Sequence, residues 1–555
     1  MRRSVIFLSL VPILIIIFVF VIPYGIALHL AFLPANSETG NINFAYTASV
    51  TIWTVKQAFL STCLALVLGL PGAWIISAKR DRFCLMLRSL CAIPFAMPSI
   101  LVILSFVIFF GASGTFNGIV KTVFNTGIPF LYKPYTIIFA HAFYNFPVIM
   151  RLAGDSFYEN RKIYSAVSAS LGASDFKTAL TVILPLSLPV IGSAVLLVFL
   201  YCFTSFALVL VLGGGPASST LAVEIYRFAS LGLDYKNAGV LALLETIICA
   251  FVFCVYLLLQ KKDRISDSVM GDITRRPLAV KKQKKPAEII FFAVYSVIVV
   301  ILILCPLLSV PVQSFFSRAS MGAKSVFSFY AFENLQEVFL PLCRSLLLTF
   351  FSASFVCVMA VMAASFLCET YSKNQCKKLP LIFIKKIMRI VIAAPLVSSG
   401  IVLGLGYLVL FGNSLYEFSV QNFILLILLH SVLALPFAFN SVYSGFSKIP
   451  SNIRNSAAIL GCSPLKRIMT IEVPLSAAYL RSAWGFSAAL SLGEMNVVMM
   501  LSGGRWETLP LYIYRAVSSY RFPQACAAGT ILLFCTLFVL MISDLKKGDT
   551  CYYEN

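Results

Sequence analysis

Two glutamates inside long apolar stretches are the residues whose type and position most clearly suggest a chemical role. Glu245 lies within one predicted membrane span, and Glu494 lies toward the outer end of another. A charged side chain is costly in lipid and usually faces a cavity or a partner. One or both acids could therefore attract a cationic solute along a pathway. The alternative is an interfacial or hydrogen-bonded acid with a structural role, and replacement by glutamine distinguishes the two.

Two histidines and two glycine runs occur at matching places in the chain. His141 and His430 precede similar loops, where each could relay protons or simply bond to a neighbouring helix. The runs at 213–215 and 503–504 could form flexible outer turns or a phosphate-binding nest. Both pairs are noteworthy because they recur at matching positions of the chain.

Catalytic and cofactor chemistry finds little support in the residue pattern. The fifteen cysteines form no CxxC pair and only three histidines are present, so no metal site is expected. There are no paired catalytic carboxylates or nucleophile motifs, so we predict no catalytic residues and no membrane-embedded enzyme. The chain also lacks a Gly-Lys dipeptide and therefore a phosphate-binding loop for ATP. We expect no cofactor in this chain.

The elements that position these residues must be membrane helices. Sixty per cent of the 555 residues are apolar and 12% are charged, and the mean hydropathy is +0.92. A soluble protein of this size needs more polar surface, so lipid must be part of the solvent. Backbone groups in lipid must be satisfied internally, which favours helices. We predict an all-α polytopic protein.

Apolar runs of about twenty residues predict about twelve spans. They lie near 4–28, 52–77, 90–111, 136–154, 184–209, 238–259, 289–312, 344–367, 388–411, 422–444, 475–500 and 525–543. The first is long for a signal peptide and no clear cleavage site follows it, so we expect an uncleaved span.

The net charge of +21 is explained by membrane orientation. Lys and Arg concentrate in short segments between apolar runs, including nine between 261 and 288. Positive charge is typical of cytoplasmic loops, which predicts that both termini are cytoplasmic. Aromatic residues lie mostly inside apolar runs, so no nucleic-acid partner is expected.

An internal repeat divides the chain into two halves. Residues 171–187 and 460–476 are identical at eight of seventeen positions, at a constant offset of 289. The repeat predicts a first unit at 1–260, a basic cytoplasmic linker at 261–288 and a second unit at 289–555. Because each unit has six spans, the two six-helix repeats enter the membrane from the same side and are parallel.

Each repeat carries one structured loop, at about 155–184 and about 445–474. Gly172 and Gly461 separate two helix-forming stretches, and glycine permits a tight turn with positive φ. Pro185 and Pro474 then mark the start of the next span. A recurring helix–turn–helix loop on the cytoplasmic side is a candidate docking surface.

The repeated loop resembles the coupling loop of binding-protein-dependent ABC importer permeases. That family has Glu-Ala-Ala, three residues, Gly and then Leu-Pro. Here 166–168 reads Ala-Val-Ser and 455–457 reads Asn-Ser-Ala, so the acidic residue is missing from both copies. The resemblance implies that the ATPase contacts comprise Ala166, Ser168, Ala169, Leu171, Gly172, Ala173 and Ser174, and Asn455, Ala457, Ala458, Leu460, Gly461, Cys462 and Ser463.

This resemblance also implies partners and location. It implies a bacterial inner-membrane subunit that works with an ATPase homodimer on the cytoplasmic face, where ATP and Mg are bound. It further implies a periplasmic or lipid-anchored solute-binding protein. Fused double permeases are typical of the branch that imports iron, thiamine and some polyamines. The segments 202–216, 221–227 and 234–238 look most like thiamine-uptake permeases.

The solute could be thiamine or a thiamine phosphate, and two alternatives to thiamine import stay open from the sequence. A permease for ferric iron or a polyamine fits the same branch. A twelve-span secondary transporter would also explain the span count and the basic linker, and Lys79-Arg80-Asp81-Arg82 faintly resembles a signature of the major facilitator superfamily. The glycines of that signature are missing, and the repeated loops would have no explanation.

Overall fold

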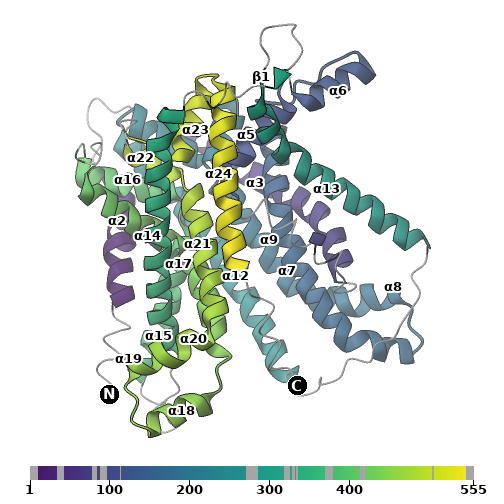
Figure 1. The fold of residues 1–555 in the computed structure, drawn as a ribbon, viewed down its shortest axis with the longest axis vertical. Helices are drawn as coiled ribbons and strands as arrows, with labels where there is room; N and C mark the ends of the chain where they lie inside the picture. Colours follow the sequence, from purple (N-terminus) through teal and green to yellow (C-terminus); the bar gives the residue numbers. More distant parts are fainter. Residues whose placement is uncertain are drawn as a thin grey trace.

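The computed structural model describes most of the chain. The described residues are 11–33, 43–77, 84, 86–87, 97–112, 114–270, 286–317, 326–327, 332, 335–368, 379–412, 414, 419–502 and 506–544. Within them the secondary structure is helical apart from one short two-stranded ladder (Figure 1). The predicted all-α class is confirmed.

The first half contains helices of very unequal length. In order they are η1 (Ile17–Val21), α2 (Ile22–His29), η2 (Leu30–Phe32), α3 (Phe44–Ile76), α5 (Ser99–Phe110), α6 (Thr115–Phe124), α7 (Pro134–Ser170), α8 (Asp175–Thr178), η3 (Ala179–Ile183), α9 (Leu184–Phe203), α10 (Ala207–Leu212), η4 (Pro216–Ser218), α11 (Leu221–Tyr226), η5 (Arg227–Leu231) and α12 (Tyr235–Met270).

The second half repeats this order with local differences. Its elements are α13 (Pro286–Phe315), β1 (Phe316–Ser317), β2 (Val326–Phe327), α14 (Leu335–Cys368), α15 (Leu379–Ala393), η7 (Ala394–Val397), α16 (Gly400–Phe411), α17 (Val420–Ser447), α18 (Ser451–Ile459), α19 (Pro464–Arg467), η9 (Ile468–Glu472), α20 (Val473–Leu475), α21 (Ala477–Gly493), α22 (Asn496–Ser502), α23 (Leu509–Ser518) and α24 (Phe522–Asp544). Strands β1 and β2 are antiparallel, with Phe316 opposite Phe327.

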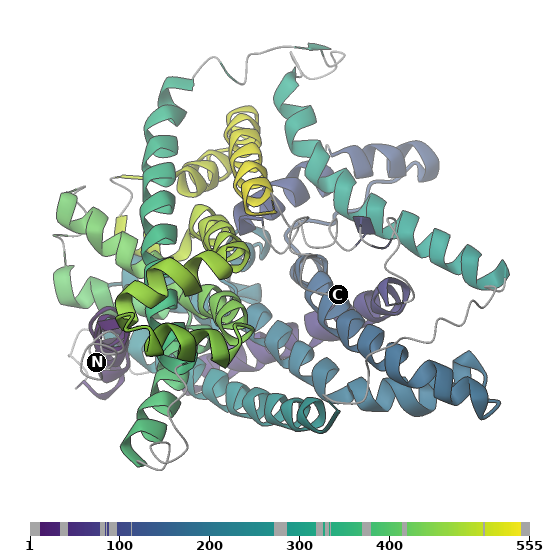
Figure 2. The same ribbon diagram turned by 60° about the horizontal axis from the view of Figure 1, so that its bottom comes forward.

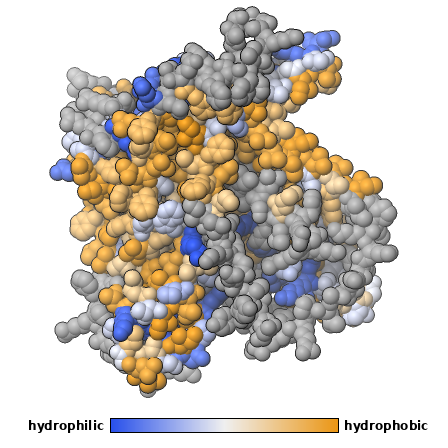
Figure 3. All heavy atoms as spheres, in the orientation of Figure 1, coloured by the Kyte–Doolittle hydropathy of each residue, from blue (hydrophilic) through white to orange (hydrophobic). Residues whose placement is uncertain are grey.

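Ten described helices are long and apolar enough to cross a membrane, and two bent helix pairs raise the number to twelve. One pair, Phe383–Leu396 with Gly400–Phe411, bends by 95°, and the other, Ala477–Gly493 with Asn496–Ser502, bends by 45°. Apolar side chains cover much of the visible side of the bundle (Figure 3). The count agrees with the predicted polytopic architecture.

The fourth predicted span differs in length from the observed helix. The hydropathy pattern ends it at residue 154, whereas α7 continues without a break to Ser170. The apolar run ends where lipid contact is expected to end, but residues 155–171 contain no glycine or proline to end the helix before Gly172. The first loop is thus an extension of a spanning helix.

The first helix of each half packs against the opposite half. Helix α2 contacts α12 of its own half and α16 of the other, and α13 contacts both α24 and α5. Tyr407 of α16 donates a hydrogen bond to the backbone oxygen of Val19 at 2.8 Å. Tyr295 of α13 similarly donates to the backbone oxygen of Leu68 in α3. The two halves are therefore interlaced.

Gly406 sets how closely α2 and α16 approach. A Cβ atom at this position would lie 1.9 Å from the backbone oxygen of Pro23. Replacing Gly406 by alanine should force the helices apart and destabilise the protein by about 1–3 kcal/mol, as overpacking does elsewhere. The apparent melting temperature in detergent measures the effect. Gly25→Ala on α2, where a Cβ meets nothing within 4 Å, should leave it near the wild-type value.

Candidate functional site

A cavity of about 280 Å³ lies where the two halves meet. Its walls come from helix breaks at corresponding places: α9 gives way to α10 after Phe203, and α21 gives way to α22 after Gly493. Interrupted helices leave polar groups near the middle of a membrane, where solute sites of transporters form. The lining residues are Ser99, His141, Tyr144, Asn145, Tyr201, Thr204, Ser205, Phe206, Ala207, Leu208, Pro395, Leu396, Ser398, Ser399, Gly400, His430, Leu433, Ala434, Phe437, Leu490, Ser491, Glu494 and Asn496.

Glu494 is the one acidic or basic side chain, histidines aside, among the described residues that line the cavity. It occupies the break between α21 and α22, and its Oε1 accepts a hydrogen bond from the backbone N–H of Val497 at 3.2 Å. That contact orients the carboxyl group at the start of α22. Ser205 lines the same cavity from the first half and stands at the equivalent position, 289 residues earlier. Glu494 therefore has no acidic counterpart at the equivalent position of the first half.

Glu245 occupies a different environment from Glu494. It is 1% exposed on α12 and lies beside Ser399, at the bend between η7 and α16. Its side chain is absent from the described lining of the cavity. The structure therefore separates the two acids that the sequence grouped together.

Both paired histidines line the cavity and bond to a neighbouring helix. His141 Nδ1 lies 3.0 Å from Gln57 Oε1 of α3, while the Gln57 amide nitrogen donates to the backbone oxygen of Cys202 at 3.0 Å. Because that amide presents its oxygen to the ring, His141 carries its hydrogen on Nδ1. His430 Nδ1 lies 2.9 Å from Ser491 Oγ of α21. These contacts agree with the interpretation in which each histidine bonds to a neighbouring helix.

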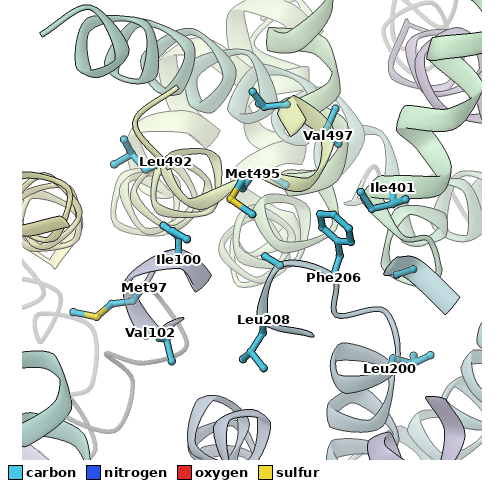
Figure 4. Close-up of a cluster of buried hydrophobic side chains, with 14 of the residues drawn as sticks. Met97, Ile100, Val102, Leu200, Phe206, Leu208, Ile401, Leu492, Met495 and Val497 are labelled. Carbon is cyan, nitrogen blue, oxygen red and sulfur yellow. The ribbon is translucent and has the colours of Figure 1, made fainter. Parts of the chain in front are cut away.

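Apolar side chains from both halves surround the cavity. Figure 4 shows Phe206 of the first half pointing toward Val497 and Ile401 of the second. Met495 of the second half lies on the side of Ile100 of the first. All five are at most 1% exposed. The cavity therefore lies within a tightly packed apolar seam between the halves.

The two predicted loops have the same backbone geometry. Gly172 and Gly461 both have φ of +77°. The N–H of Gly172 donates to the backbone oxygen of Ala169, and that of Ala173 donates to Ser168, both at 3.0 Å. The second loop repeats the pattern. The N–H of Gly461 donates to the backbone oxygen of Ala458 at 3.1 Å, and that of Cys462 donates to Ala457 at 3.0 Å. Each loop thus ends a helix with a glycine cap that favours positive φ.

Burial within the loops repeats as well. Ser168 and Ala457, at equivalent positions, are buried, whereas Leu171 and Leu460 at the turns are 81% and 84% exposed. Ala166, Ala173 and Cys462 are half-buried, and the exposed remainder comprises Ala169, Gly172, Ser174, Asn455, Ala458, Gly461 and Ser463. Each turn therefore presents one exposed leucine at its tip.

Both loops lie at the same end of the molecule. In Figure 1, α8 and the group α18, α19 and α20 occupy the lower end, while α6, α22 and α23 occupy the upper end. Figure 2, in which the lower end comes forward, shows α7 and α18 on different sides of the molecule. Both turns can therefore contact a partner that approaches from that end.

Reasoning from sequence identified the two histidines and Glu494 but missed most of the cavity lining. The aromatic residues Tyr144 and Phe437 lie inside predicted spans, where their type alone does not distinguish a lining side chain from a lipid-facing one. The paired helix breaks near Thr204 and Glu494 were a usable signal, because interruptions at matching places of two repeats indicate a solute site. The glycine pair 503–504 lies outside the described residues, whereas Gly214 and Gly215 have positive φ.

Comparison with known proteins agrees with this architecture. Residues 65–262 match the family described as binding-protein-dependent transport system inner membrane component. The thiamine transport system permease protein of Haemophilus influenzae is 25% identical over 91% of this chain and 90% of its own length. The permease proteins of the same description from Salmonella typhimurium and Escherichia coli are each 26% identical over 90% of this chain and 89% of their own. The family resemblance that the repeat indicated is confirmed.

Proposed function

We propose that this chain, which resembles the fused permease subunits of binding-protein-dependent ABC importers, moves thiamine across the bacterial inner membrane. The observation that carries the proposal is the similarity to thiamine permease proteins over nine-tenths of both chains. A similarity of that extent covers both halves and the linker, so it concerns the whole transport unit. The chain itself is a transport subunit, and a separate ATPase supplies the energy.

The chemistry of the cavity supports a cationic solute with aromatic rings. Glu494 supplies one negative charge, and the described lining contains no Lys or Arg to balance it. Tyr144, Phe206 and Phe437 add aromatic faces, which attract organic cations in a desolvated site. Thiamine carries a positively charged ring, whereas its phosphate esters carry negative charge that Glu494 would repel. Free thiamine is therefore the preferred substrate in this proposal.

The duplicated loops support an ATPase that docks as a homodimer. Two identical ATPase subunits require two similar contact surfaces, and the loops at Gly172 and Gly461 share their backbone geometry. Their exposed tips, Leu171 and Leu460, suit apolar grooves. In this arrangement the end that carries the loops faces the cytoplasm, as do both termini. A solute-binding protein delivers thiamine at the opposite end.

The proposed mechanism is alternating access. Closure of the ATPase dimer moves the two loops together, and the halves at 1–260 and 289–555 rock about the axis between them. The cavity at their seam then opens toward one face of the membrane at a time. The paired helix breaks provide the points where each half can bend.

Uptake by reconstituted transporter tests the proposal. The chain is purified with its ATPase and its binding protein, placed in proteoliposomes, and supplied with radiolabelled thiamine and ATP. We expect ATP-dependent uptake that excess unlabelled thiamine abolishes and excess thiamine pyrophosphate reduces only weakly.

Other outcomes of this experiment are informative. ATPase stimulation without thiamine uptake would keep the importer but return the substrate question to iron and polyamines. Failure of any ATPase to associate would reject the importer and favour the secondary transporter. Equal competition by thiamine pyrophosphate would contradict the preference for the unphosphorylated cation.

A further inference from the structure

A buried cluster of three charged residues lies behind the second loop. Arg454 of α18 and Arg467 of α19 both approach Glu472, with their Nε atoms 2.9 Å and 3.2 Å from its Oε1. The three side chains are only 1–7% exposed. Buried charges persist when they are paired and hydrogen-bonded, so this cluster fixes the positions of the elements that carry it.

Arg454 also binds the ends of two spanning helices. Its Nη2 donates to the backbone oxygen of Phe446 near the end of α17 at 2.6 Å. Its Nη1 donates to that of Cys368, the last residue of α14, at 3.4 Å. Carbonyl groups at a helix C-terminus carry partial negative charge, so a guanidinium is stabilised there. One side chain thus connects α14, α17, α18 and η9.

The first loop is held by different contacts. At an offset of 289, Ser165, Thr178 and Ile183 stand where the second loop has Arg454, Arg467 and Glu472. These residues cannot form the same ion pairs.

Helix continuity accounts for the difference between the loops. In the first half, α7 runs uninterrupted from the membrane to the turn, ending at Ser170, and the guanidinium of Arg161 stacks 3.6 Å from the Trp74 ring of α3. In the second half, α17 ends at Ser447 and α18 begins only at Ser451, after Pro450. A broken helix transmits displacement poorly unless its two parts are tied together.

From this geometry we infer that Arg454, Glu472 and Arg467 form a brace that positions the second docking loop for its ATPase contact. The brace replaces the helical continuity that Pro450 interrupts, so displacement of α18 reaches α14 and α17 through Arg454. The two loops therefore transmit movement of the ATPase to the spanning helices through different contacts. This inference rests on the proposed function for its consequence in transport, although the brace itself can be tested without it.

The first measurement is hydrogen–deuterium exchange of the purified full-length chain, which needs no bound ATPase. In Glu472→Gln, two buried guanidinium groups lose their anion, and we expect amides of 451–462 to exchange about tenfold faster, while 164–174 keep wild-type rates. Arg161→Gln is the matched control, in which the first loop should loosen and the second should not. Unchanged exchange at 451–462 in Glu472→Gln would overturn the brace.

The second measurement is thiamine transported per ATP hydrolysed. We expect Glu472→Gln to lower this ratio about tenfold, equivalent to about 1.4 kcal/mol of lost coupling, with ATP hydrolysis largely retained. Arg454→Lys keeps the charge but has fewer hydrogen-bond donors, so it should lower the ratio of thiamine to ATP less than Glu472→Gln does. This milder variant also serves if Glu472→Gln fails to fold. Faster exchange with an unchanged ratio would overturn the positioning role.

The two proposals fail in different ways. If the wild-type complex moves another solute, the ratio is measured with that solute and the brace stands or falls as before. If no ATPase binds the wild-type chain, the importer and the positioning role are both rejected, while the exchange data still decide whether the brace exists.

Discussion

Replacing Gly172 or Gly461 by valine is expected to lower ATP-driven uptake about tenfold or more. At φ of +77° a β-branched residue is strained by roughly 1–2 kcal/mol, so the turn and its cap hydrogen bonds should rearrange. The space around both glycines is open, since a Cβ there meets nothing within 4 Å. The loss would therefore arise from backbone geometry and not from steric overlap. ATPase binding and thiamine uptake in proteoliposomes measure it.

Gly412→Val provides a control that also places a β-branched residue at positive φ. Gly412 also has positive φ, +55°, and open space around its Cβ position, but it lies at the end of α16, away from both loops. Its variant should retain ATPase binding and coupling. Equal losses in all three variants would show that strain alone impairs the protein, and the docking role would be withdrawn.

Replacing Glu494 by glutamine is expected to reduce thiamine uptake at low substrate concentration about tenfold or more. Glu494 is the one acidic residue in the described cavity lining, and an interaction with a charged group contributes about 1.5–3 kcal/mol. Glutamine keeps an oxygen that can accept the Val497 N–H, so the helix break should persist. The expected signature is a raised KM with little change in ATP hydrolysis.

Glu245→Gln makes the same chemical change behind the cavity wall, beside Ser399, and therefore serves as its control. We expect a much smaller effect on KM, because Glu245 is absent from the described lining. Undiminished uptake in Glu494→Gln would remove the cation-attraction hypothesis. A raised KM only in Glu245→Gln would show that the acid behind Ser399, and not Glu494, attracts the solute.

The sequence predicted those features that depend on local chemistry. Apolar runs located the spans, because lipid imposes length and composition on each helix. The turns at Gly172 and Gly461 were predictable because positive φ restricts the choice of residue. The start of the following span was placed too late, because α8, η3 and α9 follow one another without a break and the span begins at Phe176, nine residues before Pro185.

Features that depend on tertiary packing were not predictable in the same way. The cavity combines His141 and Glu494, which are several hundred residues apart, and only the fold brings them together. The length of α7 was underestimated because hydropathy reports where lipid ends and not where a helix ends. The cluster around Glu472 escaped notice because a lone acid in a loop resembles an ordinary solvated charge until its burial is known.

The interlacing of the halves constrains the order in which the chain can be assembled. Pro23 reaches its packing partner Gly406 only after several hundred further residues have been synthesised. At about 5–20 residues per second, α2 must remain in the bilayer for tens of seconds without α16 beside it. The first half therefore cannot reach its final packing during its own synthesis, whereas α13 of the second half finds α5 already made. A chain truncated before α16 would keep the contact of α2 with α12 but lack the closer contact at Gly406.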